Sequence, residues 1–113
     1  MEMEISEYSH GAVSVLKPNG PLVGDDADKF KSKVLEVRTK SLGRLVLDLS
    51  GIPYVDSRGL EVLVEVSDEL AESGQALKLC SSNDVLREVL ELTELTSYFE
   101  RFVDVNAAVR SFL

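Results

Sequence analysis

The stretch LVLDLSGIPYVDSRGL, residues 45–60, decides the fold because it joins a buried strand to a helix. Its apolar start is typical of a strand that is buried on both faces. Asp56 and Ser57 then favour a helix N-cap, since their side-chain oxygens accept hydrogen bonds from backbone N–H groups that lack a partner inside the helix. Gly59 has no Cβ, which lets another backbone approach closely. We therefore expect the Ser57 hydroxyl to be exposed beside the positive end of a helix.

The rest of the chain alternates strand and helix patterns around this junction. Strand patterns cover residues 4–8, 12–17, 44–49, 77–80 and 101–105. Helical patterns cover residues 25–39, the segment from Ser57 to Gly74, a segment that begins at residues 82–84, and a last segment after Asn106.

This alternation predicts an α/β fold with parallel crossovers, in which the first two strands pair as a hairpin. We expect one domain over residues 1–113, with a mixed central sheet of four to five strands packed against about four helices. Leu47 and Leu63 are predicted core positions in the strand and helix that flank Ser57. Asp25 or Asp26 is expected to cap the first helix, and Asn106 the last.

Composition restricts the class of protein. The 113 residues are 44% hydrophobic, which suits one folded domain, and no apolar segment approaches the length needed to cross a membrane. The start, MEMEISEYSHG, has no basic region followed by an apolar one, so no signal peptide is expected. The single cysteine, Cys80, lies in an apolar run and is predicted to be a buried hydrophobe. A cytoplasmic location follows as the default expectation.

Charge restricts the partners. The chain has 12 basic and 20 acidic residues, a formal net charge of −8. Such a surface repels phosphate backbones and anionic lipid, which argues against nucleic-acid or membrane-surface binding. Residues 61–72 contain five acids and no Lys or Arg. We interpret them as the solvated face of a helix; the alternative is an electrostatic lure for a basic partner.

Catalytic residues are not expected. The segment DSRG, residues 56–59, overlaps half of a nucleophile elbow, but Val55 stands where the first glycine belongs. The only histidine, His10, comes early in a turn, and Asp48 lacks the neighbouring acids that would hold magnesium. The glycines form no phosphate-binding loop, and one Cys with one His gives no metal-ligand spacing. The sequence therefore predicts neither an enzyme nor a cofactor or metal site.

Ser57 remains as a site for modification. Phosphorylation would add about −1.5 to −2 charges. The helix N-terminus would partly stabilise this charge, whereas a partner surface packed against Ser57 would not tolerate it. The alternative is that Ser57 serves only as an N-cap.

Three segments together resemble the STAS domain of bacterial anti-sigma factor antagonists. They are DSRGL (56–60) after an LDL-type strand, LKL (77–79) and ELTEL (91–95). The similarity runs from about residue 20 to the C-terminus, and residues 1–18 fit the opening strands of the family. The resemblance implies a STAS-like single domain.

The resemblance also implies a function. The protein would capture an anti-sigma factor, a serine kinase of the histidine-kinase-like ATPase group, while Ser57 is unmodified. Phosphorylation of Ser57 would release this partner, and a serine phosphatase would reset the system. Asp56, Arg58, Gly59 and Glu61 would form the partner-binding site together with Ser57. The alternative is a STAS scaffold subunit of a larger signalling or transport complex, in which Ser57 is not switched. A monomer or weak dimer is expected.

The sequence departs from the family pattern at three positions. Arg58 replaces a residue that is usually small, and its guanidinium could pair with an acidic partner or with the phosphate itself. Val23 stands where many members have an acid. Glu94 replaces a frequent turn glycine, so the turn after that helix is expected to differ.

Overall fold

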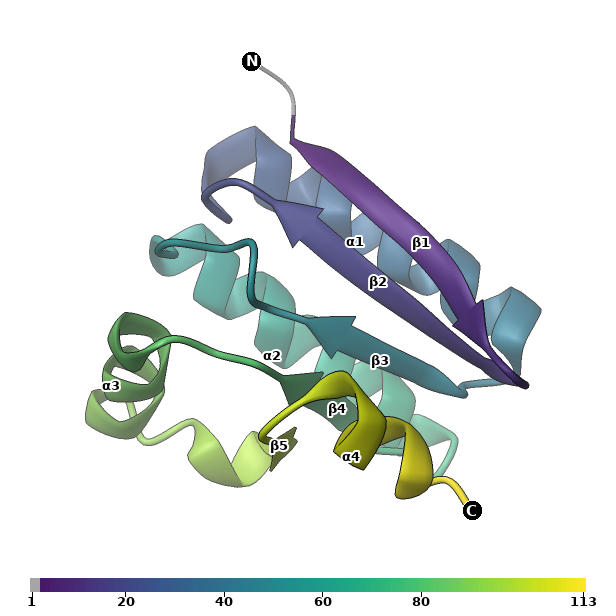
Figure 1. Cartoon of the computed structure of the whole chain (residues 1–113). Helices are drawn as coiled ribbons and strands as arrows, with labels where there is room; N and C mark the ends of the chain where they lie inside the picture. Colours follow the sequence, from purple (N-terminus) through teal and green to yellow (C-terminus); the bar gives the residue numbers. More distant parts are fainter. Residues whose placement is uncertain (1–2) are drawn as a thin grey trace.

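A computed structural model describes residues 3–113 (Figure 1). Residues 1–2, part of the segment expected to fit the opening strands, lie outside the described residues. In chain order the elements are β1 (Glu4–His10), β2 (Val13–Asn19), α1 (Gly24–Ser41), β3 (Leu45–Asp48), α2 (Ser57–Glu72), β4 (Leu77–Cys80), α3 (Asp84–Leu92), the short 3-10 helix η1 (Thr96–Tyr98), β5 (Phe99–Phe102) and α4 (Val105–Arg110). The predicted α/β architecture, with five strands and four α-helices, is confirmed.

The five strands form one mixed sheet in the order β1-β2-β3-β4-β5. β1 pairs with β2 as an antiparallel hairpin, and the remaining neighbours are parallel. Parallel neighbours need a crossover, which α1, α2 and α3 supply in turn. The carboxyl ends of β2, β3 and β4 therefore meet at one end of the sheet, where the chain leads into α1, α2 and α3.

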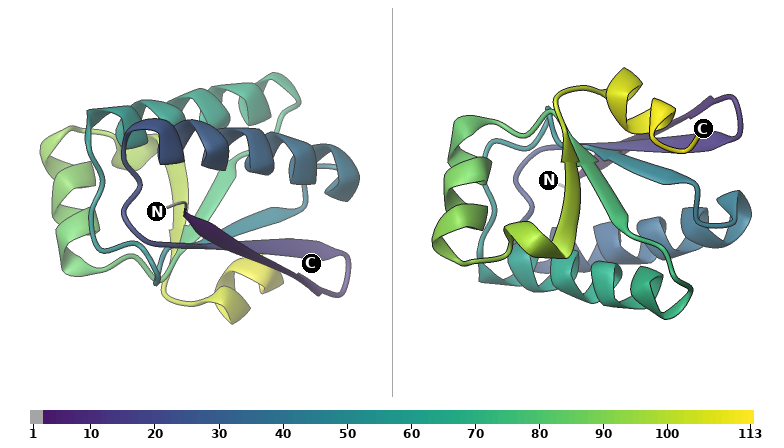
Figure 2. Two further views of the ribbon diagram at one scale, coloured as in Figure 1. Left: turned by 90° about the horizontal axis from the view of Figure 1, so that it is seen from above. Right: turned by 90° about the horizontal axis from the view of Figure 1, so that it is seen from below.

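The helices cover the two faces of the sheet unequally. α1 and α2 lie side by side on one face, α4 lies on the other, and α3 lies at the end of the sheet (Figure 2). The main core fills the space between the sheet and α1 and α2, and it includes Leu47 and Leu63, which are 0% and 3% exposed. A smaller cluster beneath α4 contains Cys80, so its predicted burial is confirmed.

The N-caps of two helices differ from the sequence expectation. Asp25 and Asp26 lie inside the first turn of α1, whose N-cap is Val23, a residue that makes no side-chain cap hydrogen bond. Asp104, and not Asn106, caps α4 by accepting from the N–H of Ala107 at 2.8 Å. At α4, Asp and Asn are both good caps, so composition alone did not separate the two candidates, which lie two residues apart.

Glu94, which replaces a frequent turn glycine of the family that the sequence resembles, has a backbone φ of 57°. This is the left-handed region that glycine enters freely and that costs other residues energy. The N–H of the next residue, Leu95, donates to the carbonyl of Leu90 at 2.9 Å and closes the end of α3. The turn therefore keeps a conformation that suits glycine, although a glutamate occupies it.

The two buried leucines in β3 and α2 allow this layering to be tested. We expect Leu47→Ala and Leu63→Ala each to lower the free energy of unfolding by about 2–5 kcal/mol, because each leaves a cavity in the core. Leu92→Ala on α3 is the matched control: Leu92 is 76% exposed, and its truncation should change stability by about 0.5 kcal/mol or less. Urea denaturation of the three variants measures the difference, and equal effects would contradict the layering.

Candidate functional site

The loop between β3 and α2 is held against the segment that precedes α1. Leu22 and Val55 form an isolated parallel bridge. The N–H of Leu22 donates to the Tyr54 carbonyl at 3.1 Å, and the N–H of Asp56 donates to the Leu22 carbonyl at 3.3 Å. Two loops at the same end of the sheet thus continue the pairing beyond their strands. This fixes the backbone from which α2 begins.

The Asp56 carboxylate caps two helices. One oxygen, Oδ1, accepts from the N–H of Gly59 in α2 at 2.8 Å, and Oδ2 accepts from the N–H of Gly24 in α1 at 3.0 Å. These bonds, that from Gly59 first, hold the pKa of Asp56 below its usual value, because they favour the charged carboxylate. Val23 therefore needs no acidic side chain: Asp56 supplies the carboxylate for the start of α1.

Gly59 is needed for the close packing of α2 against this loop. It is buried, and a Cβ added to it would lie 2.2 Å from the backbone carbonyl oxygen of Leu22. The predicted close backbone approach is present, and its partner is a segment more than thirty residues earlier in the chain.

Ser57 is the first residue of α2 and is exposed. Asp56 occupies the N-cap position, so the interpretation of Ser57 as the cap is wrong. Within residues 3–113 the Ser57 hydroxyl has no hydrogen-bond partner. Its side chain is therefore free to meet another molecule, while its backbone is fixed by the cap before it.

Arg58 is bonded to carboxylates of this same chain. Its guanidinium lies 3.0 Å (Nε) from Asp28 on α1, 3.2 Å from Glu61 and 2.9 Å from Glu65 on α2. Asp28 first, and then Glu65, raise the pKa of Arg58 further above its usual range. The side chain thus connects α1 to α2 and neutralises acids beside Ser57. Of the sequence-predicted site residues, Glu61 is engaged by Arg58 in this way.

An apolar groove follows Ser57 along α2. It is lined by Leu60, Glu61, Val64 and Glu65 from α2 and by Leu95 from the turn after α3, and it has a volume of about 350 Å³. Leu60, Val64 and Leu95 are only partly buried. Sequence reasoning did not assign Leu95 to the site, although the ELTEL segment that contains it is one of the three segments that carry the resemblance. The groove adds an apolar surface to the predicted polar turn.

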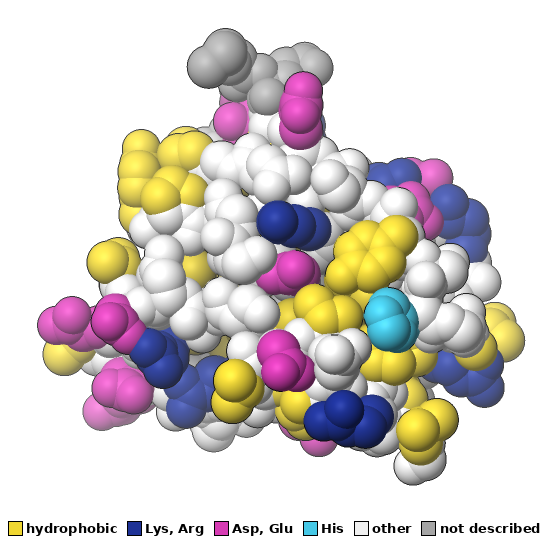
Figure 3. All heavy atoms as spheres, in the orientation of Figure 1, with side chains coloured by type: hydrophobic (Ala, Val, Ile, Leu, Met, Phe, Trp, Pro, Cys, Tyr) yellow, Lys and Arg dark blue, Asp and Glu magenta, His cyan; other side chains and the backbone are white. Residues whose placement is uncertain are grey.

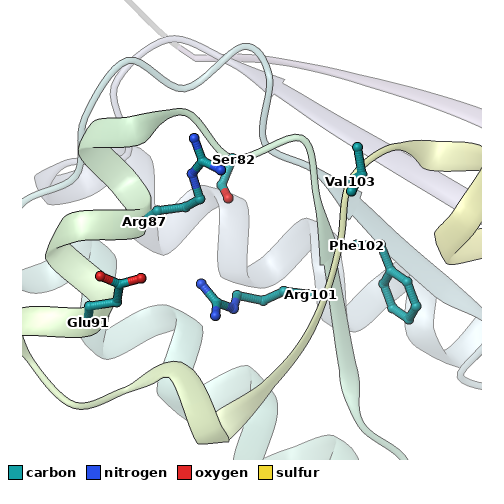
Figure 4. A pocket seen from close by; sticks show the side chains of 6 residues that line it. All are labelled: Ser82, Arg87, Glu91, Arg101, Phe102 and Val103. Carbon is teal, nitrogen blue, oxygen red and sulfur yellow. The ribbon is translucent and has the colours of Figure 1, made fainter.

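A second hollow, of about 400 Å³, lies between α3 and β5 (Figure 4). Arg87 and Arg101 point into it, and Glu91 faces them from α3. Arg87 is also paired with Asp84, so two guanidinium groups are balanced by two carboxylates. None of the predicted site residues lines this hollow.

His10 is remote from Ser57 in the fold. It lies at the last residue of β1, opposite Val13 at the first residue of β2. The parallel register places this end of β2 beside the start of β3, whereas Ser57 follows the end of β3. The two residues thus lie at opposite ends of the sheet. In the part of the chain that the structure describes, no group of three or more His, Cys, Asp or Glu residues is placed to hold a metal ion.

Neighbouring positions in α2 should differ sharply in their tolerance of alanine. We expect Gly59→Ala to lower the free energy of unfolding by about 1–3 kcal/mol, because the added Cβ collides with the Leu22 carbonyl. Ser57→Ala should change it by about 0.5 kcal/mol or less, because the exposed hydroxyl has no partner in the described residues. Chemical denaturation compares the two, and a larger effect at Ser57 would contradict the assignment of the cap to Asp56.

The shared cap should also make stability depend on pH. The pKa of Asp56 is lower in the folded state than in the unfolded state, so its contribution is present above about pH 4 and is lost as pH falls through the folded pKa. We therefore expect Asp56→Ala to lower Tm at pH 7, by an amount that shrinks below about pH 4. Asp25→Ala is the control, because the Asp25 carboxylate caps no helix in the described residues. It should lower Tm less than Asp56→Ala does at pH 7. Thermal melts at several pH values measure both, and an Asp56→Ala deficit that stays constant down to pH 2 would contradict the cap.

Comparison with known proteins places this geometry in a family. The sequence model of the STAS domain family matches residues 4–108 of this chain. A candidate anti-sigma factor antagonist of Thermotoga maritima is 31% identical over 98 residues, which cover 86% of this chain and 87% of the relative. A crystal structure of a candidate anti-sigma factor antagonist from Thermotoga maritima superposes with a TM-score of 0.86 at 27% identity, covering 95% of this chain and 92% of that one.

The Bacillus cell fate determinant SpoIIAA, in its phosphorylated form, shares the fold with a TM-score of 0.68 at 14% identity, covering 96% of this chain and 98% of that one. None of the helices within residues 3–113 is long and apolar enough to span a membrane. The family match and the Thermotoga relative together settle the family: this chain belongs to the STAS domain family, among the anti-sigma factor antagonists.

Proposed function

We propose that this chain is a cytoplasmic binding module, not an enzyme, that holds an anti-sigma factor while Ser57 is unmodified. The partner is a serine kinase of the histidine-kinase-like ATPase group, which phosphorylates Ser57 and is thereby released; a serine phosphatase restores binding. The observation that carries this proposal is the Ser57 hydroxyl, which is exposed at the start of a helix whose cap is fixed and has no hydrogen-bond partner within residues 3–113.

The surface around Ser57 supports a protein partner. The groove of Leu60, Val64 and Leu95 offers apolar area next to the hydroxyl, and Tyr54, 52% exposed, lies on the loop before it. Apolar area beside a polar feature is the common composition of a protein interface. A partner that covers both the groove and the turn would enclose Ser57.

A phosphate on Ser57 would act on binding more than on folding. The positive end of the α2 dipole favours a negative charge there, and SpoIIAA shows that this fold exists in a phosphorylated form. A partner surface packed over Ser57 would instead remove the charge from water without compensation. A penalty of about 3–4 kcal/mol would weaken the complex several hundred-fold.

Arg58 is not free to neutralise a phosphate on Ser57. It is the cation nearest to Ser57 in sequence, and it is already bonded to three carboxylates. To neutralise a phosphate it would have to leave Asp28 or Glu65. The new charge would therefore add to an acidic surface, which favours release of the partner.

The test is to recover the partner from native cells by affinity capture and to measure its affinity calorimetrically. We expect Ser57→Ala to bind like the wild type and to escape phosphorylation. Ser57→Asp should bind at least tenfold more weakly, because it places a charge at the interface, though less weakly than the phosphoprotein, which carries more charge. Ser111→Asp is the matched control: it adds the same charge at an exposed serine after α4, on the other face of the sheet.

Mass spectrometry of protein isolated from its native cells completes the experiment. Phosphate on Ser57, together with weaker binding of Ser57→Asp but not of Ser111→Asp, supports the switch. Equal affinities of the wild type and Ser57→Asp, with no phosphate on Ser57, would favour the alternative of an unswitched scaffold subunit.

A further inference from the structure

One edge of the sheet is open along its whole length. β1 pairs with β2 through all seven of its residues, from Glu4 opposite Asn19 to His10 opposite Val13. Its other side has no neighbouring strand among residues 3–113 (Figure 1). Five consecutive residues of this strand, 6–10, are exposed. The N–H and C=O groups along this edge are free to pair with another strand.

This edge lacks most of the features by which proteins usually prevent such pairing. Protective edges are short, carry bulges, contain proline, or carry charged side chains, lysine above all. The sequence of β1, EISEYSH, has neither proline nor lysine, its charged residues are Glu4 and Glu7, and its register with β2 is uninterrupted by a bulge. The opposite edge, β5, is only four residues long, and α3 lies next to it across the hollow shown in Figure 4.

We propose that two copies of this chain pair through β1, antiparallel and edge to edge, into one continuous sheet. A two-fold axis perpendicular to the sheet keeps each face of the sheet on its own side, so paired residues must share a face. Full overlap of the strand is reached when the axis passes through Glu7. Glu4 then lies opposite His10 of the other copy, and Ser6 lies opposite Tyr8.

The polar side chains along β1 are complementary in this register. The Glu4 carboxylate meets the His10 imidazole of the other copy at each end of the pairing. His10, the cyan side chain in Figure 3, is exposed on the face that α4 partly covers, so it is available for this contact. The imidazole N–H can donate a hydrogen bond to the carboxylate, and such side-chain pairs directly across two strands stabilise their pairing.

The two Glu7 residues at the axis do not oppose the pairing. The carboxylate of each Glu7 lies 3.0 Å (Oε1) from the Lys33 Nζ and 3.8 Å (Oε2) from the Lys40 Nζ, both on α1 of its own chain. The hydrogen bond with Lys33 is also the main cause of the lowered pKa of Glu7. Two carboxylates would therefore meet in the presence of four ammonium groups.

Cysteine cross-linking tests both the pairing and its register. Residues directly opposite in an antiparallel pair have Cα atoms about 4.5–5.5 Å apart, within the range of about 4.4–6.8 Å that a disulfide spans. We expect Glu7→Cys to form a covalent dimer on mild oxidation. Ser6→Cys and Tyr8→Cys should cross-link to each other when mixed, but not to themselves. The native Cys80 does not interfere, because burial raises its pKa to about 11 and shields the thiol.

Glu61→Cys on α2 is the matched control, since it also replaces an exposed glutamate by cysteine but lies away from β1. Cross-linking of Glu7→Cys that is no faster than that of Glu61→Cys would overturn the proposal. Self-cross-linking of Ser6→Cys or Tyr8→Cys in place of Glu7→Cys would overturn the Glu7-centred register.

Sedimentation of the chain without added cysteines provides an independent measurement. We expect a monomer–dimer equilibrium in which His10→Glu raises the dissociation constant several-fold, because it places a carboxylate opposite Glu4. The double variant Glu4→Lys/His10→Glu should restore the dimer, because it places an ammonium group opposite the new carboxylate. A chain that stays monomeric at millimolar concentration would overturn the proposal.

Discussion

The carboxylate of Asp56 is the contact on which the rest of the site depends. A helix N-terminus leaves several N–H groups without partners, and two such termini lie together at the carboxyl end of this sheet. Asp56 supplies one acceptor to each, through Gly59 and Gly24. The bridge between Leu22 and Val55, and the absence of a side chain at Gly59, allow the two loops to come close enough for this sharing. Ser57 is consequently held in place by its neighbours and not by its own side chain.

Arg58 balances the acidic charge around Ser57. A net charge of −8 would make a dense acidic surface on α2 unfavourable without compensation. Arg58 provides it by bonding to Asp28, Glu61 and Glu65. The large cation that departs from the family pattern is therefore a connection between α1 and α2. The turn presents a neutral hydroxyl next to an apolar groove, a surface whose character a single phosphate would change.

The two ends and the two edges of the sheet serve different purposes. The carboxyl ends of the parallel strands carry the turn of Ser57, as expected where strands lead into helices. The edge at β5 is short, whereas the edge at β1 is long and polar. Contacts at β1 and at Ser57 involve separate parts of the surface, so pairing of two copies would leave both Ser57 turns available to a partner.

The sequence by itself determined the order of elements, the layering and the position of Ser57, because these follow from apolar periodicity and turn residues within short windows. Leu47 and Leu63 were placed in the core for the same reason. The helix N-caps were harder to predict from the sequence. Nearby Asp and Asn residues are equally good candidates at α4, and the acceptor for the start of α1 is Asp56, thirty-two residues away in the chain. Only the tertiary structure decided the role of Arg58, whose partner Asp28 lies on another helix, and the place of Leu95 beside α2. These contacts depend on how helices pack across the sheet, and local periodicity carries no information about which side chains that packing brings together.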